Sequence, residues 1–240
     1  DRTSRGLGDV YKRQVYKHGC LLQHDLNLRR MEEKKYQIIL YGATGFTGKL
    51  CAEYFHSNYP DLNWAIAGRN KEKLESLKTE LNLDCDIFVA DSEDYEAIKN
   101  FVKQTKVVLS AAGPFARYST KVVEACVECK THYTDITGEN HWVKGLIDRF
   151  HDKAALDGTR IIPSCGYDSI PSDMGVFFSV TRSEKPVSHI TVYHSAKGGA
   201  SGGTTETMFT MGPLPKEMRD PFLLNPEDTV SDIQRKNSCL

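Results

Sequence analysis

Three glycines at regular spacing lie in the segment GATGFTG (residues 42–48), between an apolar run and a helical pattern. Glycine tolerates positive φ angles, and its missing Cβ lets a backbone approach a pyrophosphate closely. The N-terminus of the following helix would present free N–H groups and a partial positive charge to the phosphates. The candidate cofactor-binding residues of this loop are Gly42, Thr44, Gly45, Phe46, Thr47 and Gly48. The alternative is a tight strand-to-helix turn that binds nothing.

The end of the second predicted strand indicates which dinucleotide fits. Many NAD sites place a carboxylate there to hold the ribose 2′-OH, but this segment reads Ala67-Gly68-Arg69-Asn70. The planar guanidinium of Arg69 is suited to a 2′-phosphate. We therefore predict NADP rather than NAD as the cofactor, the alternative being that Arg69 only covers the following helix.

Two further strand ends supply candidates for the rest of the cofactor. Asp91 ends the third predicted strand and is a candidate for the adenine edge. Small residues follow the fourth strand, where they would let a nicotinamide ribose lie against the backbone. These candidates are Ala112, Gly113 and Pro114.

No residue is assigned a catalytic role. Tyr167 follows the sixth predicted strand and could donate a proton, whereas Asp168 is better explained by a turn before Pro171. Asp135 and Glu139 end the fifth strand at the same edge, where they either shape the site or cap the next helix.

Two spacing matches to other catalytic families are treated as coincidences. Tyr95 and Lys99 have the spacing of the short-chain dehydrogenase pair, but they lie on the helix before the fourth strand. Ser201 stands in a GxSxG segment, but no His follows His194, so a hydrolase triad is disfavoured.

Short apolar runs alternate with helical patterns along most of the chain. Such alternation is typical of βαβ units and of a doubly wound parallel sheet, the Rossmann-type α/β fold. The predicted strands are 36–41, 63–68, 86–91, 106–113, 131–139 and 159–166. The predicted helices are 49–57, 70–81, 94–103, 119–130 and 142–157.

Composition and charge exclude several classes of protein. The 240 residues carry a formal net charge of −1, which argues against a dedicated nucleic-acid binder. No apolar run approaches the ~20 residues of a membrane-spanning helix. The CxxC formed by Cys126 and Cys129 lies within a predicted helix and has no second pair, so no metal site is predicted. The odd number of cysteines, seven, favours reduced thiols and a cytoplasmic protein.

The chain divides into three predicted parts. Residues 1–33 form an extension outside the fold, and the basic excess of residues 1–30 is explained either by read-through before Met31 or by a transit peptide. Residues 34–168 form the dinucleotide-binding domain. Residues 169–240 begin a second, substrate-side α/β domain with a half-buried strand at 189–194, and this domain does not finish within the chain.

A combination of motifs resembles one family. The motifs are, in order, GATGFTG, WAIAGRNKEKL, VVLSAAGPF, YTDITGE and SCGYDSIPSDMG. Over residues 34–200 they resemble the saccharopine dehydrogenase-like oxidoreductases, which include the bacterial trans-acting enoyl reductases. The resemblance implies a Rossmann fold, nicotinamide binding, a larger second domain and a link to lipid metabolism, lipid droplets and membranes.

These observations together predict a function. We expect an intracellular, NADP-dependent oxidoreductase that moves a hydride to or from a small, possibly lipid-like substrate. The alternative is a non-catalytic dinucleotide-binding or scaffold protein at lipid droplets or membranes. The oligomeric state is not assigned.

Overall fold

The structure is a computed structural model of the whole chain. It describes residues 34–195, 197, 199, 202–210, 215–226, 229–232 and 235. The extension predicted at 1–33 therefore lies outside the described residues, as does Ser201.

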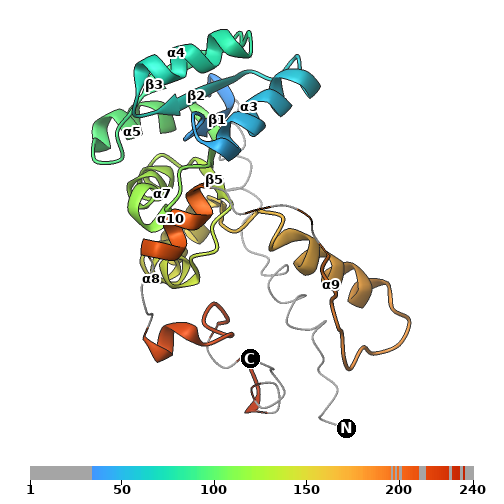
Figure 1. Cartoon of the computed structure of the whole chain (residues 1–240). Coiled ribbons are helices and arrows are strands. Elements are labelled where there is room, and N and C mark those ends of the chain that lie inside the picture. Colours follow the sequence, from blue (N-terminus) through green and yellow to red (C-terminus); the bar gives the residue numbers. More distant parts are fainter. Residues whose placement is uncertain are drawn as a thin grey trace.

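A six-stranded parallel sheet forms the centre of the fold (Figure 1). The strands are β1 (Tyr36–Tyr41), β2 (Trp64–Gly68), β3 (Asp86–Val89), β4 (Thr105–Ser110), β5 (His132–Asp135) and β6 (Ile161–Ile162). Their order across the sheet is β3-β2-β1-β4-β5-β6, and each neighbouring pair is parallel. This is the strand order of the doubly wound dinucleotide fold, so the predicted fold class is confirmed.

Helices connect the strands on both faces of the sheet. They are α3 (Phe46–Asn58), α4 (Lys71–Glu80), α5 (Tyr95–Val102), α6 (Phe115–Tyr118), α7 (Thr120–Glu128) and α8 (Asn140–Asp157). The first of them begins at Phe46, inside the glycine segment, and the helix predicted at 119–130 is preceded by the short α6. Asn70 and Asp94 cap α4 and α5 by accepting the N–H groups of Lys73 and Ala97.

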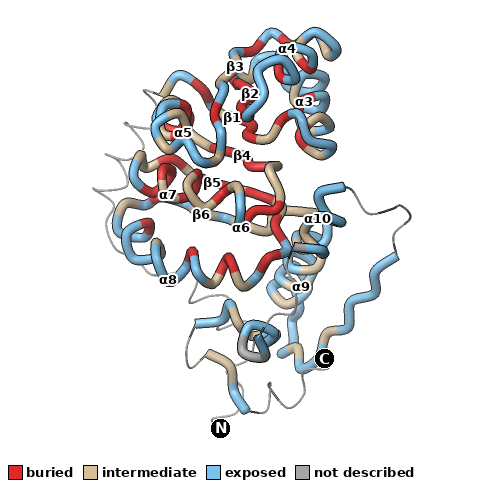
Figure 2. Tube along the Cα trace, turned by 60° about the vertical axis from the view of Figure 1, so that its left-hand side comes forward, coloured by how far each residue is buried: buried red, intermediate tan, exposed pale blue. Residues whose placement is uncertain are grey.

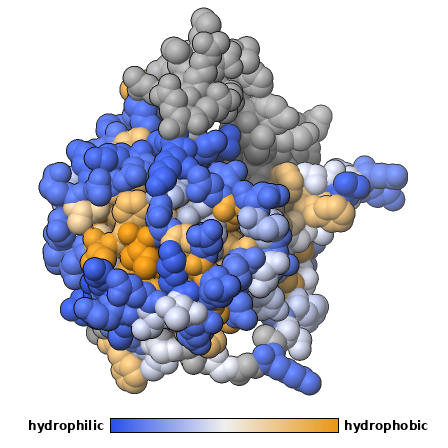
Figure 3. All heavy atoms as spheres, turned by 90° about the horizontal axis from the view of Figure 1, so that it is seen from above, coloured by the Kyte–Doolittle hydropathy of each residue, from blue (hydrophilic) through white to orange (hydrophobic). Residues whose placement is uncertain are grey.

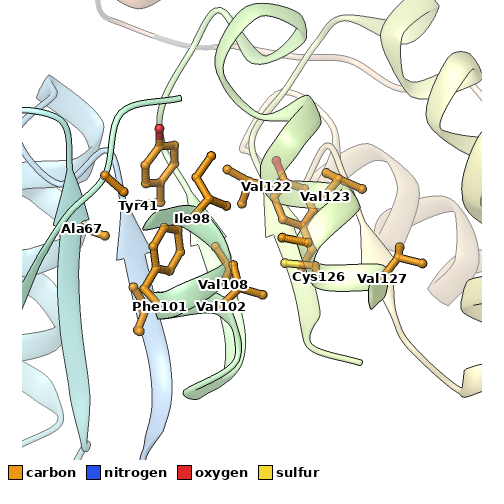
Figure 4. Close-up of a cluster of buried hydrophobic side chains, with 14 of the residues drawn as sticks. Tyr41, Ala67, Ile98, Phe101, Val102, Val108, Val122, Val123, Cys126 and Val127 are labelled. Carbon is orange, nitrogen blue, oxygen red and sulfur yellow. The ribbon is translucent and has the colours of Figure 1, made fainter. Parts of the chain in front are cut away.

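Buried side chains form two clusters, one on each face of the sheet. Leu40 and Ile66 face the cluster that α3 and α4 cover. Ile39 and Tyr41 face the cluster that α5, α7 and α8 cover, because successive strand residues point to opposite faces. In this second cluster the Tyr41 ring stacks on Phe101 with 5.7 Å between centroids (Figure 4). The sheet and the inner sides of these helices are accordingly the most buried part of the molecule (Figure 2).

After residue 168 the described chain contains helices and no strand. These elements are α9 (Ile170–Arg182), α10 (Gly202–Thr210) and the 3₁₀ helix η1 (Lys216–Arg219). The strand predicted at 189–194 is wrong: this segment has no regular secondary structure, and Tyr193 is 91% exposed. A strand needs a neighbour for its N–H and C=O groups, and the described chain places none beside this segment.

Seen from above, most of the described surface is hydrophilic, and hydrophobic side chains form one distinct cluster with smaller groups elsewhere on this face (Figure 3). No described helix is both long enough and apolar enough to cross a bilayer. α9 differs from the helices that cover the sheet, because none of its residues is buried.

Candidate functional site

The glycine loop lies where β1 ends, beside the loop that follows β4. Gly42 has a φ of +81°, and a Cβ there would lie 2.7 Å from the Ala112 nitrogen. A Cβ on Gly48 would lie 2.2 Å from the Gly42 carbonyl oxygen. Two of the three glycines are therefore required by the backbone itself, which approaches its neighbours too closely for any side chain.

The N-terminus of α3 is open to a ligand. Gly45 is its N-cap residue and provides no side-chain cap, and no acidic residue stands in the first turn. The Lys49 N–H is bonded to the Gly45 carbonyl, whereas the N–H groups that precede it have no partner within the helix. An anion at this end would meet free N–H groups and the positive end of the helix dipole.

A cavity of about 150 Å³ opens in front of this loop. It brings together six of the sequence-predicted residues, namely Gly42, Thr44, Gly45, Arg69, Ala112 and Gly113. Tyr41, Ser92 and Tyr118 complete the polar part of its wall. The Tyr41 hydroxyl has its pKa raised to about 12, mainly because its position is buried.

A second cavity, of about 270 Å³, adjoins the first. The two share Ala111 and Gly113, so the loop after β4 forms a common wall. The second cavity is also lined by Thr47, Phe115, Ile136, Gly138, Glu139, Asp168, Gly203, Thr204 and Thr207. A long ligand that fills the first cavity and passes Gly113 would therefore enter the second.

Arg69 leaves the end of β2 as an exposed side chain on the first cavity. Its guanidinium carbon lies 5.7 Å from the centre of the Tyr118 ring. No ion pair involves Arg69 in the described part of the chain. The second strand thus ends in an unpaired cation, with no carboxylate in the position that usually holds a ribose 2′-OH.

The remaining predicted residues lie nearby but outside the first cavity. Asp91 follows β3 and uses its carboxylate within a turn, where it accepts the Glu93 N–H at 2.9 Å. Pro114 is buried and occupies the N-cap position of α6 without a side-chain hydrogen bond. Thr47 lines the second cavity. Phe46 is 70% exposed at the start of α3. Roles for these residues in holding a cofactor stay predictions.

Glu139 is a site residue whose main contact the sequence did not reveal. Its side chain is 2% exposed and borders the second cavity. One carboxylate oxygen accepts the Phe115 N–H at 2.8 Å, and the other accepts the Ala116 N–H at 3.0 Å. The carboxylate therefore caps α6 from another segment of the chain, while Trp142 stacks on Phe115 from the same side. The sequence motif contained Glu139 but gave no signal for this partner.

Asp135 fastens the ends of β5 and β6 together beneath the same edge. It is buried and accepts hydrogen bonds from the Tyr133 hydroxyl, the Thr137 N–H and the Ser164 N–H. Burial raises the pKa of this carboxyl above its usual value of 3.8. These bonds join the end of β5 to the segment that follows β6, which indicates a structural role.

Other candidates fall outside the cavities. Tyr167 is 69% exposed and lines neither cavity, whereas the neighbouring Asp168 lines the second. Tyr95 lies on α5, and the Lys99 ammonium sits 5.8 Å from its ring rather than at the candidate site. Cys126 is buried and Cys129 is half-buried, both as free thiols. Among the described residues no group of His, Cys, Asp and Glu is arranged to hold a metal ion.

Comparison with known proteins identifies the family. The model of the saccharopine dehydrogenase NADP-binding domain matches residues 38–162, which contain the sheet except for the start of β1, together with the glycine loop and Arg69. The chain belongs to this family. Its cofactor is accordingly NADP, in agreement with the unpaired Arg69 and the missing carboxylate at the end of β2.

Full-length relatives extend the comparison beyond this domain. A trans-acting enoyl reductase of Mycobacterium tuberculosis is 39% identical over 154 residues, covering 63% of this chain and 37% of the relative. The enzyme of that name from Mycobacterium leprae is 33% identical over 219 residues, covering 84% and 52%. The chain thus spans about half or less of the length of these curated relatives.

A solved structure supports the fold. Apo saccharopine dehydrogenase (L-Glu forming) from Saccharomyces cerevisiae aligns with a TM-score of 0.51 and 17% sequence identity. The alignment covers 61% of this chain and 31% of the yeast enzyme. At this identity the match concerns the fold alone.

Proposed function

We propose that this chain is the cofactor-binding part of an NADP-dependent oxidoreductase that moves a hydride to or from a small, lipid-like substrate. The observation that carries the proposal is the pair of adjoining cavities. The first contains the glycine loop and Arg69, and the second continues past Gly113 along the carboxyl edge of the sheet. Open α/β folds bind their ligands at this edge, where the strand order reverses.

The residues around the first cavity fit the cofactor. The free N–H groups at the start of α3 and the close backbone at Gly42 suit the pyrophosphate. Arg69 suits the 2′-phosphate, and Asp91 is the proposed residue for the adenine edge. Ala112, Gly113 and Pro114 would lie against the nicotinamide ribose. NADPH supplies a hydride when it is bound, and the protein positions it.

The second cavity is the proposed place for the substrate. Glu139 and Asp168 are its charged lining residues, and none of the residues described around it is Lys, Arg or His. A substrate carboxylate would therefore meet negative charge without a partner. This favours a neutral substrate, such as a carbonyl or enoyl lipid, in keeping with the names of the mycobacterial relatives.

Cofactor binding is the first test. Arg69→Ala should weaken NADPH binding about ten- to hundredfold, since hydrogen bonds to charged groups contribute roughly 1.5–3 kcal/mol. NADH binding should be unchanged, because NADH has no 2′-phosphate. Isothermal titration of both dinucleotides measures this, with Arg149→Ala on α8 as a matched surface control. Unchanged NADPH affinity in Arg69→Ala, or equal affinity of the wild type for NADPH and NADH, would refute the assignment.

Turnover separates the enzyme from its alternative, a non-catalytic binding or scaffold protein at lipid droplets or membranes. The exposed apolar side chains of α9, among them Met174, Phe177 and Phe178, favour contact with an apolar surface. NADPH oxidation is measured as the loss of absorbance of the reduced nicotinamide. Neutral enoyl or carbonyl lipids are compared with amino diacids as substrates. Turnover of the neutral compounds alone supports the proposed enzyme. Tight NADPH binding with no turnover of either class supports the alternative.

A further inference from the structure

Two arginines lie close to one aromatic ring, that of Tyr118, which lines the first cavity. The Tyr118 ring lies 5.7 Å from the guanidinium carbon of Arg69 and 5.2 Å from that of Arg117. Both distances are within the ~6 Å at which a cation is attracted to the face of an aromatic ring. Tyr118 comes from α6, about fifty positions along the chain from Arg69. The fold, rather than local sequence, creates this group of three.

The group holds positive charge without a matching anion. No ion pair to Arg69 or Arg117 occurs within the described residues. Two guanidinium groups close to one ring repel each other. An anion close to both groups would offset this repulsion. The unpaired cations therefore point to an anionic ligand at this end of the cavity.

Arg69 also needs a support to bind with a defined geometry. It is exposed, and it precedes the N-cap residue Asn70 in the turn after β2. A free arginine side chain loses rotamer entropy when a ligand fixes it. Stacking on Tyr118 restricts the side chain before the ligand arrives, so less of this entropy is lost on binding.

We infer that Tyr118 and Arg117 determine the preference for the 2′-phosphorylated dinucleotide: Tyr118 positions Arg69 by stacking, and Arg117 adds a second cation. This inference rests on the proposed NADP site and adds two residues from α6 to it. In it the ring of Tyr118 matters and its hydroxyl does not. The phosphate contact belongs to the two guanidinium groups.

The test compares NADPH and NADH binding in four variants of the full chain. In Tyr118→Leu the stacking surface is lost, and NADPH affinity should fall about two- to fivefold while NADH affinity is unchanged. Tyr118→Phe retains the ring and should match the wild type. Arg117→Ala should weaken NADPH binding alone, by a factor that shrinks as salt is raised. Arg69→Ala reports separately on the underlying site.

The outcomes separate this inference from the proposed function. If Arg69→Ala loses the NADPH preference while Tyr118→Leu and Arg117→Ala keep it, the inference fails and the NADP site stands. If Tyr118→Leu weakens NADPH and NADH equally, the ring contacts a shared part of the two cofactors and the inference fails. If Arg69→Ala also has no effect, the proposed 2′-phosphate site fails first. Circular dichroism shows that each variant is folded before its affinity is compared.

Discussion

The carboxylate of Glu139 is expected to be a main support of the wall between the two cavities. It accepts the backbone N–H groups of Phe115 and Ala116, which follow Gly113 and Pro114, and Gly113 lines both cavities. Glu139→Gln keeps the size of the side chain and one acceptor oxygen. Its amide nitrogen would face the second N–H, so that two donors oppose each other at a buried position.

The expected magnitude follows from these contacts. A hydrogen bond to a charged group contributes about 1.5–3 kcal/mol, and one of the two is lost outright in Glu139→Gln. The amide is easier to bury than the carboxylate, which moves the expected loss toward the lower end of this range. For a chain of this size, the melting temperature should fall by roughly 3–12 °C.

Urea unfolding measures the loss directly. Glu139→Gln should lower the unfolding midpoint with an unchanged slope, because the surface exposed on unfolding is the same. Glu53→Gln, an exposed position on α3, is the matched control and should stay within about 0.5 kcal/mol of the wild type. A Glu139→Gln midpoint equal to that of the control would show that the carboxylate does not hold this loop.

Two further predictions concern the glycine loop and the edge of the sheet. Gly48→Ala should destabilise the protein by about 1–3 kcal/mol and weaken NADPH binding, because the new Cβ meets the Gly42 carbonyl. Gly145→Ala on α8, where a Cβ meets nothing within 4 Å, should be neutral or slightly stabilising in the same thermal melts. Burial and the Arg160 charge lower the pKa of His132 below its usual 6.5, and its neutral Nδ1 accepts the Arg160 N–H. The stability that this group contributes is present above pH 6.5 and is lost as the pH falls through its lowered pKa. The wild type should therefore lose more stability than His132→Gln in urea titrations between pH 7 and pH 5 (roughly the window of histidine titration); parallel losses would contradict this.

The sequence was sufficient to predict the sheet because each element carries its own periodic pattern. Ile98, Phe101 and Val102 are spaced for one face of a helix, and all three are fully buried. The shortest strand, β6, is two residues long instead of the predicted eight, because it is an edge strand that pairs only with β5 in the described sheet. The segment 189–194 has the alternating pattern of a strand but no partner strand among the described residues. A local pattern does not show whether a partner is present.

The sequence predicted residues of the candidate site only where a single segment of the chain contains them. The glycine loop and Arg69 stand directly after strands, and parallel topology brings strand ends to one edge. The contacts of Glu139 with Phe115 and of Tyr118 with Arg69 join segments that are distant in sequence. Nothing in a single sequence relates such pairs, because their proximity depends on how α6 lies between the strand ends.

The glycine loop alone is weaker evidence for dinucleotide binding than Arg69 is, because a strand-to-helix turn that binds nothing could need the same glycines. β1 and β4 pair so that Tyr41 lies beside Ser110, and this register brings Gly42 against Ala112. Gly42 is therefore needed for packing whether or not a phosphate binds there. No such packing requirement accounts for the two guanidinium groups near Tyr118, which form no ion pair within the described residues. The two arginines near Tyr118 are for this reason stronger evidence for a dinucleotide site than the glycines are. Substituting these arginines should weaken cofactor binding without impairing folding, whereas substituting the glycines should affect both.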